Sequence, residues 1–261
     1  MPTYYPQLDS SGTLAQYPYS SSASFDTVRD DMDMGRRYAF ARIGAGLSNF
    51  PTEPLYRWPN NYSSLTQAQA DTLEAFFDSM AGRFGEFTYL DPGGNLVKQS
   101  ELFSHASWSG AGVGSTGITD PWGGSLACTV SGSLSTTVLP DGGAAGFVLC
   151  GSVYVKGSGS VTLSLSGAGS RVWTLPANDW TRVFISGTIA TSSAVAFSIA
   201  LPGAVSLFGA QCVPMPGPGE YAKSPGNYGL HSKCRFDTDE LSFRHLGPDQ
   251  IAVSAPIAEY F

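Results

Sequence analysis

The sequence contains few charged residues. Only 13% of its residues are Asp, Glu, Lys or Arg, whereas ordinary globular domains carry roughly 25%. It also lacks a basic surplus, since the net charge is −7. Because binding to phosphates requires a basic surface, this charge argues against nucleic acid as a specific partner. No apolar run approaches the roughly 18 residues of a membrane-spanning helix, so we expect no membrane insertion.

Signatures of catalysis and of metal binding are also missing. The four cysteines have no C-x-x-C spacing and the three histidines are isolated, so we expect no zinc site. There is no G-x-S-x-G nucleophile motif, and no glycine-rich loop is followed by G-K-[ST]. We therefore expect neither a cofactor nor an enzymatic activity. Glycine and proline are abundant, with 31 and 17 residues of 261, and 12% of the residues are aromatic. The chain is thus rich in turns but too apolar to be disordered.

The few charges are distributed unevenly along the chain. Between Ser104 and Gly219, 116 residues, we count six charged side chains, whereas the remaining 145 residues carry 29. The charged fraction therefore changes from about 20% to about 5% and back. Turn-rich segments lie near both steps, at Asp91–Asn95 and Pro214–Gly219. This pattern predicts a charge-poor module, residues 95–223, inserted into a host domain formed by residues 1–94 and 224–261.

In the host domain, one segment has the pattern of an amphipathic helix, from Gln67 to Ala81. Thr66 and Gln69 fit a capping box at its start, and Gly82 is suited to its C-terminal end. Four apolar residues recur with helical spacing and predict a face that contacts the core rather than a ligand groove: Leu73, Phe76, Phe77 and Met80. The other segments are typical of strands, namely residues 37–43, 55–58, 86–90, 234–237, 240–245 and 251–259. Together they predict a small α+β or β-sandwich domain.

The segment Leu73–Pro92 resembles tailed-phage distal tail and minor tail proteins. In those families a helix ending "FF…G" is followed by "G-x-F-x-Y-x-D-P", and Arg235–Phe243 with a last strand ending at Glu259 matches how such domains close. The resemblance implies a ring-forming domain, usually hexameric, that joins the tail tube to the tail tip and contacts the tail hub. It also implies a protein assembled in the host cytoplasm and located at the virion tail tip. Extra domains are commonly inserted in such proteins.

The predicted module has no helical periodicity. Short runs rich in β-branched residues alternate with Gly/Ser turns, at residues 125–130, 146–155, 160–165, 171–175, 181–189 and 195–201. This spacing predicts an antiparallel β-sandwich or jelly roll. The opening Asn95–Trp108 is similar to that of carbohydrate-binding-like jelly rolls in phage tail proteins, and Phe208–Gln211 with Tyr221 resembles their closing strand. Phe208 stands where that family usually has Trp, and Cys212–Val213 replace an acidic residue.

A sugar site requires aromatic faces with a few polar groups around them. The candidates are Trp108, Asp120, Trp122, Tyr154, Trp173 and Trp180. The segment Asp120–Gly124 is the best loop candidate, because a carboxylate stands beside the indole ring. A Trp in a sandwich is, however, more often part of the core. Three carboxylates of the module are weak candidates for a structural calcium site: Asp120, Asp141 and Asp179.

The resulting hypothesis is a structural virion protein, a tail-tip ring component whose inserted module binds host surface polysaccharide. The alternatives are a free-standing polysaccharide-binding adhesion protein and, with less support, a depolymerase, which requires two facing carboxylates. The acidic cluster Asp30–Asp33 is either a solvated loop or a repulsive lining for passing DNA. For assembly in the cytoplasm, buried free thiols are expected at Cys128, Cys150, Cys212 and Cys234. Cys128 and Cys150 lie on strand-like segments and could instead pair.

Overall fold

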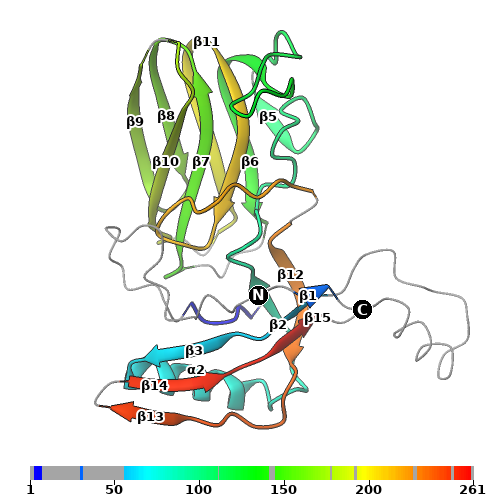
Figure 1. The fold of residues 1–261 in the computed structure, drawn as a ribbon, viewed down its shortest axis with the longest axis vertical. Coiled ribbons are helices and arrows are strands. Elements are labelled where there is room, and N and C mark those ends of the chain that lie inside the picture. The colour runs from blue at the N-terminus through cyan, green and yellow to red at the C-terminus, as the bar shows by residue number, and fades with distance from the viewer. Residues whose placement is uncertain are drawn as a thin grey trace, which may run out of the picture. The chain divides into compact units, whose positions relative to one another are not determined.

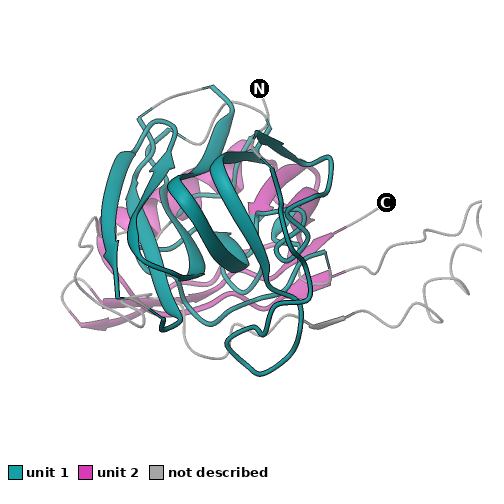
Figure 2. Cartoon of the chain, turned by 90° about the horizontal axis from the view of Figure 1, so that it is seen from above, with its two compact units in different colours: residues 1–20, 90–230 teal, residues 21–89, 231–261 magenta. Residues whose placement is uncertain are grey.

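The computed structural model describes residues 3–7, 30–31, 56–110, 112–140, 145–176, 178–190, 193–225, 228–247 and 250–259 (Figure 1). It is mainly β, with antiparallel strand pairs, as predicted. The chain divides into two compact units (Figure 2). Unit 1 comprises residues 1–20 and 90–230, and unit 2 comprises residues 21–89 and 231–261. The charge steps and turn-rich segments of the sequence predict boundaries near residues 94 and 224. The assignment of the two parts to a ring domain and an inserted module stays a prediction.

Unit 1 is a β-sandwich built around one long strand. The strands of its main path follow the order β10-β7-β11-β6-β5, while β8 pairs with β11 and β9 pairs with β8. Their bounds are β5 Trp108–Gly110, β6 Cys128–Leu139, β7 Val148–Lys156, β8 Gly159–Leu165, β9 Gly169–Leu175, β10 Thr181–Thr188 and β11 Val195–Val213. All six strands predicted for the module are present, although β6 and β11 extend well beyond the predicted ranges. The short strand β5 was not predicted.

A bend in β11 lets one strand serve both layers of the sandwich. Its first part pairs with β8 through residues 197–200, and its second part pairs with β7 through residues 206–213. The register on β6 shifts between Leu201 and Val205, where the strand bends. The core between the layers is formed by alternate inward side chains, such as Val153, Leu163 and Phe197. A Cβ atom on Gly151 would lie 2.6 Å from the Phe197 ring, so this close approach requires glycine.

Unit 2 contains the predicted helix, α2, which runs from Gln67 to Ser79. The capping box is confirmed: the Thr66 hydroxyl accepts from the amide of Gln69, and the Gln69 side chain accepts from the amide of Thr66 at 2.9 Å. The helix ends two residues earlier than predicted. A turn follows, with Gly82 in the left-handed region at φ 64°. The apolar face contacts the core, since the Phe77 ring lies 4.9 Å from that of Phe236.

Two sheets complete unit 2. The first has the order β1-β2-β15-β12-β4 and the second the order β13-β14-β3. Their bounds are β1 Asp30–Asp31, β2 Tyr56–Trp58, β3 Asn61–Leu65, β4 Phe87–Leu90, β12 Leu230–Phe236, β13 Arg244–Gly247, β14 Gln250–Ser254 and β15 Ile257–Glu259. The backbone of Asp30–Asp31 forms strand β1, and the rest of the acidic cluster lies outside the described residues. The predicted strand 37–43 also lies outside them.

Three details of the predicted strands of unit 2 were wrong. The predicted strand 240–245 begins only at Arg244, because Thr238 turns the chain through its hydroxyl, which donates to the Glu240 carbonyl at 2.7 Å. The predicted strand 251–259 is interrupted at Pro256, which has no N–H to donate to a sheet. Its two halves therefore enter different sheets, as β14 and β15. Strand β3 was not predicted.

Candidate functional site

A loop in unit 1, residues 120–126, is held by hydrogen bonds to the carboxylate of Asp120. This side chain is buried and accepts three backbone N–H groups, from Trp122 at 2.9 Å, Gly124 at 3.0 Å and Leu126 at 3.3 Å. A Cβ atom on Gly124 would lie 2.5 Å from Oδ2 of Asp120, so glycine is required there. Asp120 was a candidate for contacting a sugar or calcium. The structure instead directs its oxygens into its own loop, where they fix the position of Trp122.

Trp122 is exposed but firmly oriented. Its ring lies 5.2 Å from that of Tyr154, 5.1 Å from that of Phe208 and 5.5 Å from that of Tyr221, and the Tyr221 ring is stacked at an interplanar angle of 24°. Despite these contacts, 59% of the Trp122 surface is exposed. Aromatic contacts of this kind contribute roughly 0.5–1.5 kcal/mol each. They order the indole without covering it, and so provide a fixed apolar platform.

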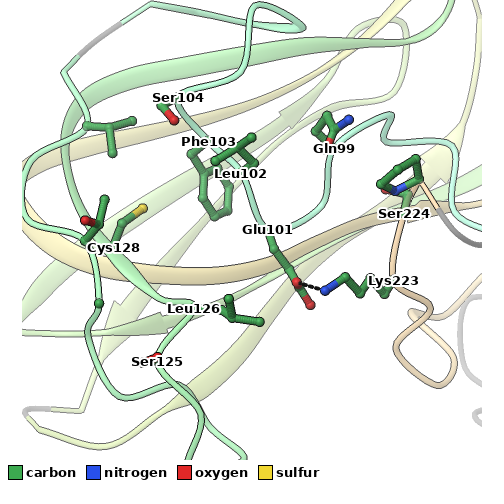
Figure 3. Close-up of a pocket in the computed structure, with 14 residues that line it drawn as sticks. Gln99, Glu101, Leu102, Phe103, Ser104, Ser125, Leu126, Cys128, Lys223 and Ser224 are labelled. Atoms are coloured by element: carbon green, nitrogen blue, oxygen red, sulfur yellow. Dashed lines mark ion pairs between the residues drawn. The ribbon is translucent and has the colours of Figure 1, made fainter.

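A pocket of about 310 Å³ is formed in unit 1 by residues near this loop (Figure 3). Its lining combines apolar and polar side chains from three parts of the chain, residues 99–104, 113–128 and 223–225. Figure 3 shows the ion pair between Glu101 and Lys223, whose Oε2 and Nζ atoms are 2.5 Å apart. The Glu101 side chain is only 12% exposed, whereas that of Lys223 is 57% exposed. The carboxylate therefore lies deeper than the ammonium group.

Tyr221 connects the platform to the pocket. Its ring stacks on Trp122, while its hydroxyl donates to Ser100 Oγ at 2.8 Å and lies 3.3 Å from Oε1 of Glu101. Burial raises the pKa of the Tyr221 phenol well above its usual value, and the charge of Glu101 adds to this effect. The phenol therefore remains a hydrogen-bond donor at neutral pH. The Tyr221 side chain thus contacts both the Trp122 platform and the Glu101 carboxylate of the pocket.

The segment that carries Tyr221 and Lys223, residues 214–224, is called the strap here. Arg182 on β10 fastens it by donating to the carbonyl of Gly219 at 2.6 Å and to that of Pro218 at 3.1 Å. The same guanidinium donates to Ser152 Oγ on β7 at 3.1 Å and to Oε1 of Gln211 on β11. Gln211 in turn donates to the carbonyl of Glu220 at 2.9 Å. The strap is therefore tied to three strands of the sandwich.

Asn95 fixes the chain segment that leads into the pocket residues 99–104. It is fully buried, and its side chain donates to the carbonyls of Ala210 at 3.0 Å and Ala222 at 2.9 Å. Its Oδ1 accepts from the amides of Val97 and Cys212, both at 3.0 Å. All hydrogen-bonding positions of this amide are thus used to join the segment after β4 to β11 and the strap. The Asn of the opening motif therefore has a structural role in positioning the segment that contains Glu101.

The structure places the other predicted aromatic residues apart from Trp122, except for Tyr154. Trp108 is buried against Phe103, and its indole N–H donates to the carbonyl of Gln99 at 2.9 Å. Trp173 is half-buried, and its N–H donates to the carbonyl of Phe184 at 2.8 Å, while the Arg171 guanidinium lies 4.1 Å above its ring. Trp180 is half-buried just before β10. Among the ring contacts of the described residues, none of these three tryptophans contacts the cluster formed by Trp122, Tyr154, Phe208 and Tyr221.

The structure gives no support to a calcium site among the described residues, which contain no cluster of three or more His, Cys, Asp or Glu side chains able to hold a metal ion. Asp179 is exposed, and Asp141 lies outside the described residues. No described helix is long and apolar enough to span a membrane.

All four cysteines are free and buried, as expected. Cys150 and Cys212 lie on neighbouring strands, but Gly151 is the residue opposite Cys212. Because successive side chains point to opposite faces of a sheet, the two thiols lie on opposite faces. Burial raises the pKa of Cys128 to about 11 and that of Cys150 to about 12. The thiols of Cys128 and Cys150 are therefore protonated at neutral pH and weakly reactive.

Sequence reasoning missed three residues of the site. Glu101 and Lys223 were not singled out, and Tyr221 was noted only for its place in a closing motif. Glu101 and Lys223 are far apart in the sequence, so no local pattern links them. The charge step gave no signal either, because the charge-poor stretch runs from Ser104 to Gly219 and both residues lie outside it.

Comparison with protein-family models and with curated protein sequences gave no match. Among solved structures, the enzymatically active domain of tailspike protein 4 from bacteriophage CBA120 matches with a TM-score of 0.35 and 13% identity, over 46% of this chain and 21% of that chain. This chain therefore spans about a fifth of the tailspike chain.

Two carbohydrate-binding modules give similar matches. The CBM22-1 xylan-binding domain of Paenibacillus barcinonensis Xyn10C has a TM-score of 0.29 and 15% identity, over 49% of this chain and 93% of that chain. The CBM6cm-2 module of Cellvibrio mixtus lichenase 5A, in complex with cellotriose, has a TM-score of 0.30 and 16% identity, over 45% of this chain and 96% of that chain. No function follows from these matches, because the identities and the TM-scores are low.

Proposed function

We propose that unit 1 binds carbohydrate at the site formed by Trp122 and the adjacent pocket. The observation that carries this proposal is the exposed indole, which three aromatic rings and the Asp120 loop hold in place beside a pocket of mixed polarity. A sugar ring has apolar C–H faces and polar edges. An aromatic platform next to a few fixed donors and acceptors matches both parts of such a ligand.

A glycan array with the full chain tests the proposal. Trp122→Ala should abolish binding, because it removes the platform. Phe84→Ala provides a matched control, since Phe84 is an exposed aromatic residue of unit 2 and lies outside the site. The expected result is that the Phe84 variant retains the wild-type binding pattern. Unchanged glycan binding by Trp122→Ala would contradict the proposed site.

We also propose that the chain is a structural component of a phage tail tip, where it forms a ring, typically of six copies, that joins the tail tube and tail hub. It is assembled in the host cytoplasm and is located in the virion, where the carbohydrate site contacts host polysaccharide. The resemblance of Leu73–Pro92 supports this role; that segment contains part of the capped helix α2 and all of strand β4. Multiple copies in a ring would increase the avidity of weak sugar contacts. Size measurement of purified protein and detection in virions test the proposal; a strict monomer that is absent from virions contradicts it.

The alternative is a free-standing polysaccharide-binding adhesion protein. Strong binding that depends on Trp122, without any ring assembly, would favour it. A depolymerase is less well supported, because Glu101 is the single carboxylate among the residues that line the pocket, whereas glycoside hydrolysis requires a pair. We therefore propose binding without catalysis. An assay for released reducing sugar tests this part, and release from a host polysaccharide would overturn it.

A further inference from the structure

We infer, resting on the proposed carbohydrate site, that its ligand is an uncharged sugar residue whose two neighbouring hydroxyl groups bridge Glu101 and Lys223. The pocket thus selects the electrostatic class of its ligand. This selection comes from the arrangement of the two charges in the pocket and not from the aromatic platform.

The two charged groups are complementary to a pair of adjacent hydroxyl groups. Their atoms are 2.5 Å apart, with the carboxylate of Glu101 deep in the pocket and the ammonium of Lys223 at its edge. A sugar hydroxyl can donate and accept, whereas a carboxylate only accepts and an ammonium group only donates. One hydroxyl can therefore donate to Glu101 while its neighbour accepts from Lys223. Both bonds involve a charged partner and are stronger than neutral ones.

The same pair disfavours charged sugars. Glu101 and Lys223 neutralise each other, and they are the only charged side chains among the residues that line the pocket. A uronate that paired with the exposed Lys223 ammonium would place a second carboxylate beside that of Glu101, whose side chain is only 12% exposed. An amino sugar could pair with Glu101 only by displacing the ammonium group of Lys223. The first arrangement brings two like charges together at a mostly buried group, and the second only exchanges one cation for another, so neither improves on the existing ion pair.

The apolar lining provides the remaining contacts. Leu102 and Leu126 are exposed hydrophobic residues, and both line the pocket together with Phe103 and Val113. Figure 3 shows Leu102, Phe103 and Leu126 on the side of the ion pair where Glu101 lies. The C–H groups of a sugar ring can contact these side chains while its hydroxyl groups reach the two charges. The C–H groups and the hydroxyl groups of an uncharged sugar thus match the apolar and the charged side chains of the pocket.

Calorimetric titration of the full chain with three sets of polymers tests this inference. The sets are neutral (mannan, galactan and arabinoxylan), acidic (polygalacturonate) and cationic (chitosan oligosaccharides at pH 6). The wild type should bind at least one neutral polymer and neither charged one. Glu101→Gln leaves Lys223 unpaired, so it should weaken neutral binding about tenfold or more and gain polygalacturonate binding that falls with added salt.

Lys223→Gln gives the opposite change and keeps the test open if the Glu101 variant does not fold. It should weaken neutral binding and gain binding of chitosan oligosaccharides. Lys156→Gln, on β7 and outside the pocket lining, should leave the wild-type preference unchanged. Near-ultraviolet circular dichroism establishes that each variant is folded.

The outcomes separate the two proposals. If the wild type binds polygalacturonate as tightly as any neutral polymer and Trp122→Ala abolishes that binding, the ligand class is wrong while the carbohydrate site stands. The same conclusion holds if both charge variants fold but keep the wild-type preference. If the wild type binds none of the polymers, both proposals fall.

Discussion

The role of Asp120 leads to a graded prediction for two substitutions. Oδ1 of Asp120 accepts the two short bonds, from Trp122 and Gly124, and Oδ2 accepts the longer one from Leu126. Asp120→Ala removes all three acceptors and the charge. Asp120→Asn can keep the two short bonds through its own Oδ1, but it places an amide NH₂ group against the N–H of Leu126. The two variants therefore separate the loss of the loop anchor from the loss of charge.

The expected magnitudes follow from these bonds. A hydrogen bond to a charged group contributes roughly 1.5–3 kcal/mol, and a neutral one roughly 1 kcal/mol. Counting the two short bonds at the lower charged value, we expect Asp120→Ala to lower the free energy of unfolding by about 3 kcal/mol. Asp120→Asn retains two neutral bonds and should cost about 1–2 kcal/mol. With an m-value near 2 kcal/mol per molar urea, the alanine variant should shift the midpoint by about 1.5 M.

Urea unfolding followed by tryptophan fluorescence measures both variants, and titration with a glycan bound by the wild type measures the site. Asp120→Ala should also lose glycan affinity, because the loop no longer orients Trp122, whereas Asp120→Asn should largely keep it. Equal destabilisation by the two variants would refute the view that Oδ1 of Asp120 accepts both short bonds and that asparagine keeps them. Full glycan affinity in a destabilised alanine variant would refute the view that the loop orients the platform.

Three further predictions concern the strap, the helix and the thiols. Arg182→Met should lower the free energy of unfolding by about 3 kcal/mol and reduce glycan affinity, because the strap carbonyls lose their donor; unchanged affinity in calorimetry would contradict the role of the strap. Thr66→Ala should cost about 1 kcal/mol in urea unfolding through loss of the helix cap; a change near zero would argue against the capping box. Cys128 and Cys150 should not react with a thiol reagent at pH 8 until the protein is unfolded, and rapid labelling of the folded protein would contradict their burial. Because burial raises their pKa above the ordinary value of 9.0, their contribution to stability is present below pH 9 and is lost as the pH rises towards 11–12.

The structure of short segments was predictable where it depends on neighbouring residues. The capping box of Thr66 and Gln69 and the apolar spacing of α2 are properties of one turn or a few turns, and the helix forms where expected. The strands of unit 1 were predictable for the same reason, since alternation and Gly/Ser turns are local signals. The errors arose where the pairing with other strands determines the structure. At Pro256, for example, one predicted strand is divided between two sheets.

The candidate site was only partly predictable. The loop containing Asp120 and Trp122 was identified because a carboxylate and an aromatic ring adjoin in the sequence. The function expected of Asp120 did not match its position, since side-chain burial depends on the final fold. Of the five aromatic candidates, only Trp122 and Tyr154 meet in one cluster of rings.

The sequence by itself determined the composition, the uneven charge, the helix and most strands of unit 1, because these depend on residues close together in the chain. Only the tertiary structure decided which tryptophan is exposed and which carboxylate reaches the pocket. Glu101 and Lys223 meet because the strap returns across the sandwich, and Arg182 fixes it there. Contacts between residues so far apart arise from the packing of whole sheets, and no local pattern of residues specifies them.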